Sequence, residues 1–243
     1  MTNLAIDIGN TLVKTALFER GQVVDIFKSD ELTVDFLERT IFPHHPDIEN
    51  GIMISTRGPV PEVERYLANR LKRFVRFDHT TPIPIKNLYE TPETLGPDRL
   101  AAAVGAAAVD PGSNVLVVDF GTAITIDFIT ADGKFLGGNI SPGAGARFKA
   151  LHQFTGKLPL LELSEETQLL GKTSHHAIIS GVINGIIYEI DGYIERLRKD
   201  FGNFKIIFTG GDGIFFAKRF KNPIFATYDL VVYGLNQILE HNV

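Results

Sequence analysis

The chain of 243 residues contains no cysteine and no tryptophan, and only two methionines. Without cysteine there is no disulfide framework and no thiolate metal site, so the fold must depend on a hydrophobic core. The hydrophobic content of 44% over this length is enough for one large core or two medium ones. A reducing compartment is compatible with this composition.

An excess of positive charge is also missing. The formal net charge of −5 and the pI near 5.8 argue against nucleic acid as the main partner. The one small basic cluster consists of Lys72, Arg73 and Arg76, interleaved with Phe74 and Phe77. This pattern fits a short edge strand with a charged outer face better than a nucleic-acid patch.

Long apolar runs are scarce. The most apolar late stretch, Ala177–Ile190, is interrupted by Asn184 and Glu189 and is too short to span a bilayer. The N-terminus enters a strand at Leu4 without the basic and apolar regions of a signal peptide. We therefore expect a soluble, cytoplasmic protein with no membrane contact.

The chain is organised around a strand that ends in an aspartate. Val115–Val118 is an apolar, β-branched run, and Asp119 follows it directly. Gly121 and Thr122 then begin a tight bend into a second β-rich run, Ile124–Thr130. Such a bend gathers backbone N–H groups, a hydroxyl and a carboxylate, which phosphate oxygens and a cation favour.

The same pattern occurs near the N-terminus. An interval of 112 positions separates the members of three pairs: Asp7 and Asp119, Gly9 and Gly121, and Gly21 and Gly133. A repeat of this length indicates duplicated domains, with a nucleotide held between two phosphate turns. The linker Asp110–Ser113 precedes the second copy, so we predict domains at 1–112 and 113–243.

Further elements follow from periodicity and turn residues. We predict three strands within Leu4–Lys28 and two more strands at Gly51–Ser55 and Lys205–Phe208. The predicted helices are Thr33–Phe42, Val60–Leu71, Leu100–Val109, Ala146–Gln153, Ser174–Lys199 and Tyr233–His241.

Asp98 precedes the alanine-rich segment Leu100–Val109, whose helix must pack very closely against a neighbour. The residue stands where a helix N-cap is expected, and hydrogen bonds from helix N–H groups would lower its pKa. The same carboxylate could orient a hydroxyl for phosphoryl transfer, which tolerates a weak base. Arg99 beside it could bind an anionic substrate group, and the capping and catalytic roles are compatible.

Glycine-rich segments mark other candidate sites. Gly137–Gly145 has four glycines among nine residues and reads as a loop that lets backbone approach a ligand, although it could simply turn the chain. Gly210 and Gly211 follow a strand and suit an adenine or ribose. Gly181 and Gly185 recur at helical spacing, which suits a close helix–helix contact within or between subunits.

Together these segments resemble the type III pantothenate kinases, members of the acetate and sugar kinase, heat-shock ATPase and actin superfold. The matching segments come in the family's order: Asp7–Thr11 with Lys14, Gly96–Arg99, Asp119–Ala123 with Thr125 and Asp127, Gly137-Gly138 with Pro142-Gly143, and Thr209–Gly211. Gly96–Arg99 and the short chain make the resemblance specific. Pro97 departs from the family's usual alanine and stiffens the approach to Asp98.

The resemblance implies an α/β fold of duplicated ribonuclease-H-like (actin-like ATPase) domains, each a mixed five-stranded sheet flanked by helices, with ATP between them. It implies ATP-dependent phosphorylation of the primary hydroxyl of pantothenate, the first step towards coenzyme A. It also implies a homodimer in which the partner chain completes the pantothenate pocket.

The resemblance assigns roles position by position, with Asp98 as the general base. The implied contacts of ATP and Mg²⁺ are Asp7 (linked to Mg²⁺ directly or through water), Ile8, Gly9, Asn10, Thr11, Leu12, Val13, Lys14, Gly121, Thr122, Gly210 and Gly211. The implied pantothenate contacts are Tyr89, Gly96, Pro97, Asp98, Arg99 and Thr173. Asp119 resembles the ligand of a monovalent cation, K⁺ or NH₄⁺, and Asp127 stays open between a structural and a metal-linked role.

Three alternatives remain open. A kinase of the same superfold acting on another small hydroxyl substrate would share both Asp-x-Gly turns but not Gly96–Arg99. A non-enzymatic relative, such as an accessory factor in transcription, would not need Asp7, Asp98 and Asp119, which are all intact. A chaperone or filament ATPase would need a substrate-binding domain for which 243 residues leave no room.

Overall fold

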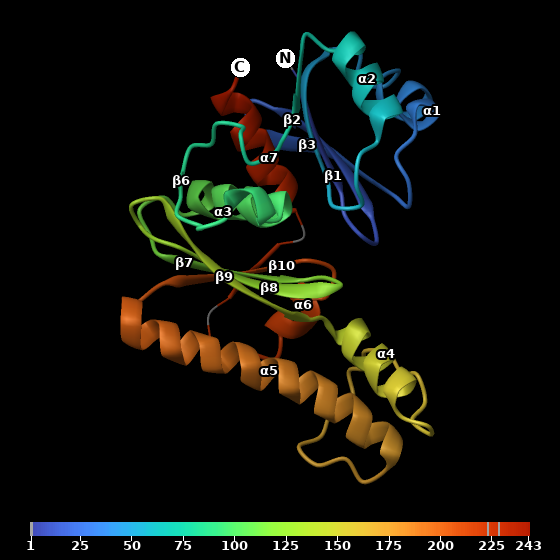
Figure 1. The fold of residues 1–243 in the computed structure, drawn as a ribbon, viewed down its shortest axis with the longest axis vertical. Coiled ribbons are helices and arrows are strands. Elements are labelled where there is room, and N and C mark those ends of the chain that lie inside the picture. Colours follow the sequence, from blue (N-terminus) through green and yellow to red (C-terminus); the bar gives the residue numbers. More distant parts are fainter. Residues whose placement is uncertain (1, 223, 228) are drawn as a thin grey trace. The chain divides into compact units, whose positions relative to one another are not determined.

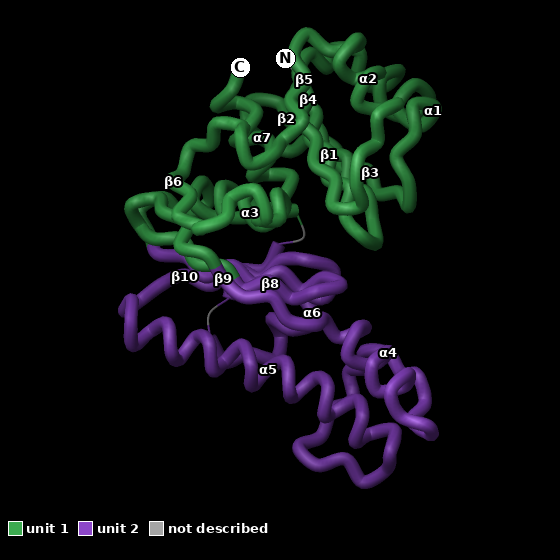
Figure 2. Tube along the Cα trace, in the orientation of Figure 1, with its two compact units in different colours: residues 1–113, 127–137, 229–243 green, residues 114–126, 138–228 purple. Residues whose placement is uncertain are grey.

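The computed structural model describes residues 2–222, 224–227 and 229–243, and contains two mixed β-sheets with flanking helices (Figure 1). The chain divides into two compact units (Figure 2). Unit 1 comprises residues 1–113, 127–137 and 229–243, and unit 2 comprises residues 114–126 and 138–228. The division into domains 1–112 and 113–243 stays a prediction.

The first sheet has the strand order β3-β2-β1-β4-β5. Its strands are β1 (Thr2–Ile8), β2 (Val13–Glu19), β3 (Gln22–Ser29), β4 (Ile48–Ser55) and β5 (Arg73–Arg76). β1 pairs antiparallel with β2 and parallel with β4. The short basic strand β5 lies at the edge of the sheet, as its charge pattern predicted.

The second sheet has the order β11-β10-β7-β8-β9-β6. Its strands are β6 (Lys86–Asn87), β7 (Val115–Phe120), β8 (Ala123–Ile129), β9 (Lys134–Pro142), β10 (Lys205–Thr209) and β11 (Phe225–Ala226). β10 pairs parallel with β7 and with β11, just as β4 pairs parallel with β1 and β5. The repeated strand order confirms the predicted duplicated α/β fold, and β6 is an addition to the second copy.

The predicted helices are confirmed, with boundaries that shift by a few residues. The helical elements are α1 (Val34–Phe36), the π-helix η1 (Leu37–Ile41), α2 (Pro61–Arg70), the 3₁₀ turn η2 (Pro92–Thr94), α3 (Pro97–Val109), α4 (Ala144–Phe154), α5 (Ser174–Phe201), α6 (Gly213–Ala217) and α7 (Leu230–His241). The prediction of a loop over Gly137–Gly145 was wrong. β9 continues to Pro142, and Gly143 is the N-cap of α4.

Helix α5 extends two residues beyond the predicted end at Lys199, and the apolar stretch Ala177–Ile190, which was expected to be too short to span a bilayer, lies within this longer helix. It has 28 residues, and by length and composition alone it meets the criterion for a membrane-spanning helix. The core helix of a soluble protein meets the same criterion. Its buried residues are Ile178, Ile179, Ser180, Val182, Ile183, Ile186, Ile190 and Ile194, and α5 runs along the β7–β10 region of unit 2 (Figure 1).

The two faces of β1 pack against different parts of unit 1. Leu4, Ile6 and Ile8 belong to a hydrophobic cluster that includes residues of η1 and α2. On the alternate face, the Asn3 amide donates to Asn236 of α7 at 3.0 Å. Both asparagines are buried. Because a buried amide needs a partner, this hydrogen bond fixes where α7 crosses the sheet.

Helices α3 and α7 of unit 1 approach so closely that only glycine fits at the contact (Figure 1). A Cβ on Gly234 would lie 1.8 Å from the carbonyl oxygen of Ala101. A Cβ on Gly105 would lie 2.6 Å from the carbonyl oxygen of Leu230. The alanine-rich sequence of α3 predicted close packing, and α7 is the neighbour that requires it.

We expect Gly234→Ala to destabilise the protein by at least about 3 kcal/mol, because the added methyl group overlaps backbone atoms that cannot move independently. Gly192→Ala in α5 is the matched control, since a Cβ on Gly192 would meet no neighbouring side chain or backbone within 4 Å. The control should be neutral or stabilising by up to about 1 kcal/mol. Urea unfolding of both variants measures the difference, and equal stabilities would contradict the packing argument.

Candidate functional site

The turn between β1 and β2 brings an aspartate and a lysine together. Asp7 and Lys14 are direct partners across the antiparallel pair, so their side chains lie on the same face. Gly9 donates its N–H to the carbonyl oxygen of Leu12 at 3.1 Å, which closes the turn. Residues 10–11 at the tip are exposed. The predicted phosphate turn therefore presents a carboxylate, an ammonium group and polar side chains from one short hairpin.

Lys14 has a second acidic neighbour that sequence reasoning missed. Its Nζ lies 4.0 Å from Oδ1 of Asp229, the residue that precedes α7. Asp229 is far from Lys14 along the chain and belongs to no recognisable motif, so no sequence signal could have paired them.

The turn between β7 and β8 has the same construction in unit 2. Gly121 donates its N–H to the carbonyl oxygen of Ala123 at 3.1 Å. Asp119 is partly buried at the strand end, whereas Gly121 and Thr122 are exposed. The next side chain, Phe120, is fully buried among other phenylalanine rings, which fixes the position of the strand end.

Glycines from two other segments surround this second turn. A Cβ on Gly143 would lie 2.2 Å from the carbonyl oxygen of Gly121, and Gly143 donates its N–H to the carbonyl oxygen of Thr122 at 3.0 Å. Gly210 has a positive φ of 84°, and a Cβ there would lie 2.3 Å from Oδ1 of Asp119. Gly143 lies in the segment expected either to approach a ligand or to turn the chain, and in the structure it packs against the chain's own turn at Gly121 and Thr122.

A pocket of about 370 Å³ lies beside the segment that follows β10. It is lined by Asp212, by Gly145, Phe148 and Lys149 of α4, and by Leu160–Leu163. Burial raises the pKa of Asp212. The lining combines apolar side chains with the carboxylates of Asp212 and Glu162 and the ammonium group of Lys149, which suits a ligand that has both an apolar face and polar groups.

Asp98 was expected to be the N-cap of α3, and this prediction was wrong. The N-cap is Gly96, Pro97 is the first helical residue, and Asp98 is the second. Proline is well tolerated at the first helical position, because its missing N–H would have no intrahelical acceptor there. The helix therefore begins at Pro97, before Asp98, whereas the prediction placed Asp98 just outside the helix. Asp98 Oδ1 accepts the N–H of Arg99 at 2.9 Å and lies over Gly96.

The expected pKa of Asp98 is corrected as well. Burial raises the pKa of Asp98 above its ordinary value and outweighs the lowering by the Arg99 N–H and the Arg99 charge. The sequence could not show this, because desolvation depends on what packs around the carboxylate. A carboxylate with a raised pKa is a stronger base than a helix cap would be.

Arg99 is buried and forms an ion pair with Asp127, which is also buried. Its Nε lies 3.1 Å from Oδ1 and 3.2 Å from Oδ2 of Asp127, and its Nη2 lies 2.5 Å from Oδ1. Asp127, whose role the sequence left open, is thus the ion-pair partner of Arg99. The Arg99 guanidinium was expected to face an anionic substrate group, but much of its hydrogen-bonding capacity is used by Asp127.

Tyr89 lies beside the same arginine in unit 1. The Arg99 guanidinium carbon is 5.6 Å from the centroid of the Tyr89 ring. Gly137, with a positive φ of 110°, would bring a Cβ to 3.4 Å from this ring. The structure therefore brings Tyr89 to Arg99, the residue that follows Asp98, and brings Gly96 close to the Asp98 carboxylate. Thr173, another predicted substrate contact, is the N-cap of α5 in unit 2, and its hydroxyl accepts the N–H of His176.

A small polar pocket next to Asp98 had no sequence signal. It has a volume of about 160 Å³ and is lined by Pro97, Ser55, Arg76, His79 and other residues of unit 1. The Ser55 hydroxyl is buried and has no hydrogen-bond partner among the residues that the structure describes. The pocket forms where the ends of β4 and β5 meet the start of α3, a junction that only the fold creates.

Comparison with known proteins gives a consistent result. The family model described as type III pantothenate kinase matches residues 3–196. A protein of Phocaeicola vulgatus named type III pantothenate kinase is 42% identical over 240 residues, which are 99% of this chain and 98% of that protein. A protein of Bacteroides fragilis with the same name is 44% identical over 241 residues, again 99% of this chain and 98% of that protein.

Among solved structures, a Campylobacter jejuni protein described as a proposed Baf family transcriptional activator has a TM-score of 0.62 and 26% identity, with 98% of each chain covered. Several more distant neighbours share the fold alone, which is the actin-like ATPase fold of many kinases.

Proposed function

Because the chain belongs to the type III pantothenate kinase family, we infer that it phosphorylates pantothenate in coenzyme A biosynthesis and that Asp98 is its general base. One observation carries the assignment of the base: the Asp98 carboxylate lies in the first turn of α3 beside Gly96, and a pKa raised by burial agrees with this role. Such a group can accept the proton of the primary hydroxyl as phosphoryl transfer proceeds.

The residues around Asp98 bind and orient pantothenate in this proposal. Gly96 and Pro97 shape the approach to the carboxylate, and Tyr89 supplies a ring and a hydroxyl. Arg99, held by Asp127, keeps Tyr89 and the start of α3 in place. Thr173 adds a hydroxyl from the start of α5.

ATP is the phosphate donor, and a divalent cation accompanies it. We assign the ATP phosphates to the turn from Asp7 to Lys14, with Gly121 and Thr122 as further contacts and Gly210 and Gly211 near the nucleoside. Among the described residues no three His, Asp or Glu side chains gather to hold a metal. Asp7 with the polar tip of its turn fits Mg²⁺, which prefers few carboxylates, phosphate oxygens and water. Bound Mg²⁺ would neutralise phosphate charge.

Asp98→Asn should reduce kcat by roughly 10²–10⁴-fold, the usual effect of removing a positioned base. ATP binding should persist, because the ATP phosphates are assigned to other segments. Turnover of pantothenate and direct titration with ATP test the two expectations. The raised pKa adds a pH dependence: as pH falls through it, Asp98 becomes protonated and kcat/KM for pantothenate, which reports ionisation of the free enzyme, falls. This acid limb should lie above the pKa of an ordinary aspartate and be absent from Asp98→Asn.

If the variant keeps near-native turnover, Asp98 is a structural residue of α3 and the proposed base is wrong. Asp132→Asn is a suitable control, because Asp132 is exposed in the turn between β8 and β9 and pairs with Lys134 there. The control should retain the acid limb of the wild-type profile.

We further propose that Asp119 binds a monovalent cation, K⁺ or NH₄⁺. At the interval of 112 positions, Ile126 stands where Lys14 stands in the first copy, so the second turn does not repeat the lysine. A large, weakly hydrated cation beside Asp119 would offset repulsion between this carboxylate and the ATP phosphates. Backbone carbonyl groups and phosphate oxygens would complete its shell.

An assay of ADP release with pantothenate tests both the reaction and the cation. Replacing K⁺ by Na⁺ at constant ionic strength should raise the KM for ATP more than it lowers kcat. Asp119→Ala should lose activity together with the response to K⁺. A flat K⁺ titration of the wild-type protein would eliminate the cation site, and absence of pantothenate-dependent ADP release would eliminate the function.

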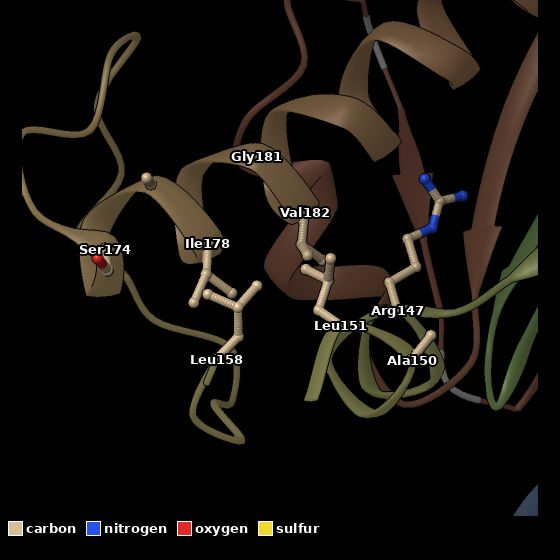
Figure 3. A pocket seen from close by; sticks show the side chains of 9 residues that line it. Arg147, Ala150, Leu151, Leu158, Ser174, Ile178, Gly181 and Val182 are labelled. Atoms are coloured by element: carbon tan, nitrogen blue, oxygen red, sulfur yellow. The ribbon is translucent and has the colours of Figure 1, made fainter. Parts of the chain in front are cut away.

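We also propose that the protein is a homodimer formed through α5. A pocket of about 670 Å³ opens along this helix, lined by Ile178, Gly181 and Val182 with Arg147 and Leu151 of α4 (Figure 3). Nothing lies within 4 Å of a Cβ built on Gly181. A two-fold contact would place Gly181 and Gly185 near their symmetry mates and cover this apolar surface.

Gly181→Arg should convert the dimer to monomers, because the new side chain enters open space in one chain but the partner's surface in a dimer. Ala68→Arg on the exposed side of α2 is the control and should stay dimeric. Sedimentation at micromolar concentration gives the oligomeric state. Activity should fall as the fraction of dimer falls, since the partner chain is proposed to complete the pantothenate pocket. A fully active wild-type monomer would refute this proposal.

Location in the cytoplasm belongs to the same proposal. Pantothenate phosphorylation consumes ATP, and the apolar residues of α5 are accounted for by burial within unit 2 and by the proposed partner. No nucleic acid or membrane is needed for this function.

A further inference from the structure

An arginine that belongs to none of the sequence motifs holds the phosphate turn. Arg57 follows β4, and its Nε donates to the carbonyl oxygen of Gly9 at 2.5 Å. Its Nη1 donates to the carbonyl oxygen of Asp30 at 2.7 Å. The preceding residue, Thr56, donates both its N–H and its hydroxyl to the carbonyl oxygen of Ile8, at 2.9 and 3.2 Å.

The charge of Arg57 is not neutralised within the described part of the chain. Both of its acceptors are neutral backbone carbonyl groups, and no carboxylate lies within ion-pair distance of it there. The other cations near the predicted site have acidic neighbours, since Lys14 lies near Asp229 and Arg99 pairs with Asp127. Arg57 is also exposed to solvent.

These facts fit a group prepared for an anion. Two carbonyl groups fix the guanidinium plane, so little conformational freedom is lost when a ligand binds. The Nη2 N–H groups have no acceptor among the described residues and are available for a charge-assisted hydrogen bond. No ion pair has to be broken first, as it would for an arginine held by a carboxylate.

We propose that Arg57 is an additional phosphate-binding residue, whose Nη2 contacts the ATP polyphosphate while Nε holds the Gly9 carbonyl group. This inference depends on the proposed assignment of the phosphates to the Asp7–Lys14 turn. The alternative is that Arg57 is only a clamp that shapes the turn. The two roles differ in whether they require the positive charge or the bridge between two carbonyl groups.

Two substitutions of Arg57 distinguish the role of its positive charge from the role of its hydrogen bonds to the carbonyl groups of Gly9 and Asp30. Arg57→Lys keeps the charge but cannot bridge both carbonyl groups, and Arg57→Gln loses the charge as well. We expect Arg57→Gln to raise the KM for ATP about tenfold, as for a lost charge-assisted hydrogen bond. Arg57→Lys keeps the charge but loses the fixed guanidinium plane, so it should raise this KM by a smaller factor than Arg57→Gln does. Because charge is involved, Arg57→Gln should also weaken the dependence of this KM on ionic strength.

Arg65→Gln, at an exposed position of α2, is the matched control and should leave the KM for ATP unchanged. Equal impairment of Arg57→Lys and Arg57→Gln would overturn the proposal in favour of a clamp, and an unchanged KM in Arg57→Gln would overturn it as well. Thermal unfolding of both Arg57 variants shows whether a change in KM comes from misfolding; a lower melting temperature in Arg57→Gln alone, with KM unchanged, counts against phosphate binding.

Lys14→Gln in the same assay distinguishes a failure here from a failure of the proposed phosphate site. If Lys14→Gln raises the KM for ATP and Arg57→Gln does not, only the role of Arg57 is overturned. If neither variant changes this KM, the assignment of the phosphates to the Asp7–Lys14 turn fails together with it.

Discussion

The close contact between α3 and α7 is the constraint on which the functional arrangement of unit 1 depends. Gly105 and Gly234 let the two helix backbones touch, and larger residues would force them apart. Helix α3 begins with the proposed base, Asp98, and α7 is tied to β1 through the hydrogen bond between Asn3 and Asn236. Since β1 ends at the Asp7–Lys14 turn, α7 links the start of α3 with that turn within unit 1.

The two duplicated turns share a backbone pattern but differ in the charged side chains that they carry. Both copies place an aspartate at a strand end and a glycine two residues later, because the bend needs a small residue there. The first copy adds Lys14 and the Arg57 guanidinium, whereas the second has Ile126 at the position matching Lys14. The first turn therefore has a lysine of its own, and the second has none at the matching position, where we propose a monovalent cation.

Much of this organisation could be predicted from the sequence, because local patterns and one long repeat are read directly from residue order. The strand–turn–strand units, the basic edge strand and most helices were predictable from periodicity. The burial of Asp98, the use of Arg99 by Asp127 and the approach of Gly143 to Gly121 were not. Each of these features depends on residues that only folding brings together. Neither the desolvation of a carboxylate nor the close approach of two backbone segments leaves a local pattern in the sequence.

Helix α7 also has a consequence for biosynthesis. It completes unit 1, yet every residue of unit 2 precedes it in the chain. A ribosome therefore releases all of unit 2 before the first unit can acquire its last helix, and until then the glycine-lined side of α3 is uncovered. Unit 1 cannot mature as an independent domain before unit 2 has been synthesised, and Asp98 and the Asp7–Lys14 turn become fixed relative to each other only once α7 has followed.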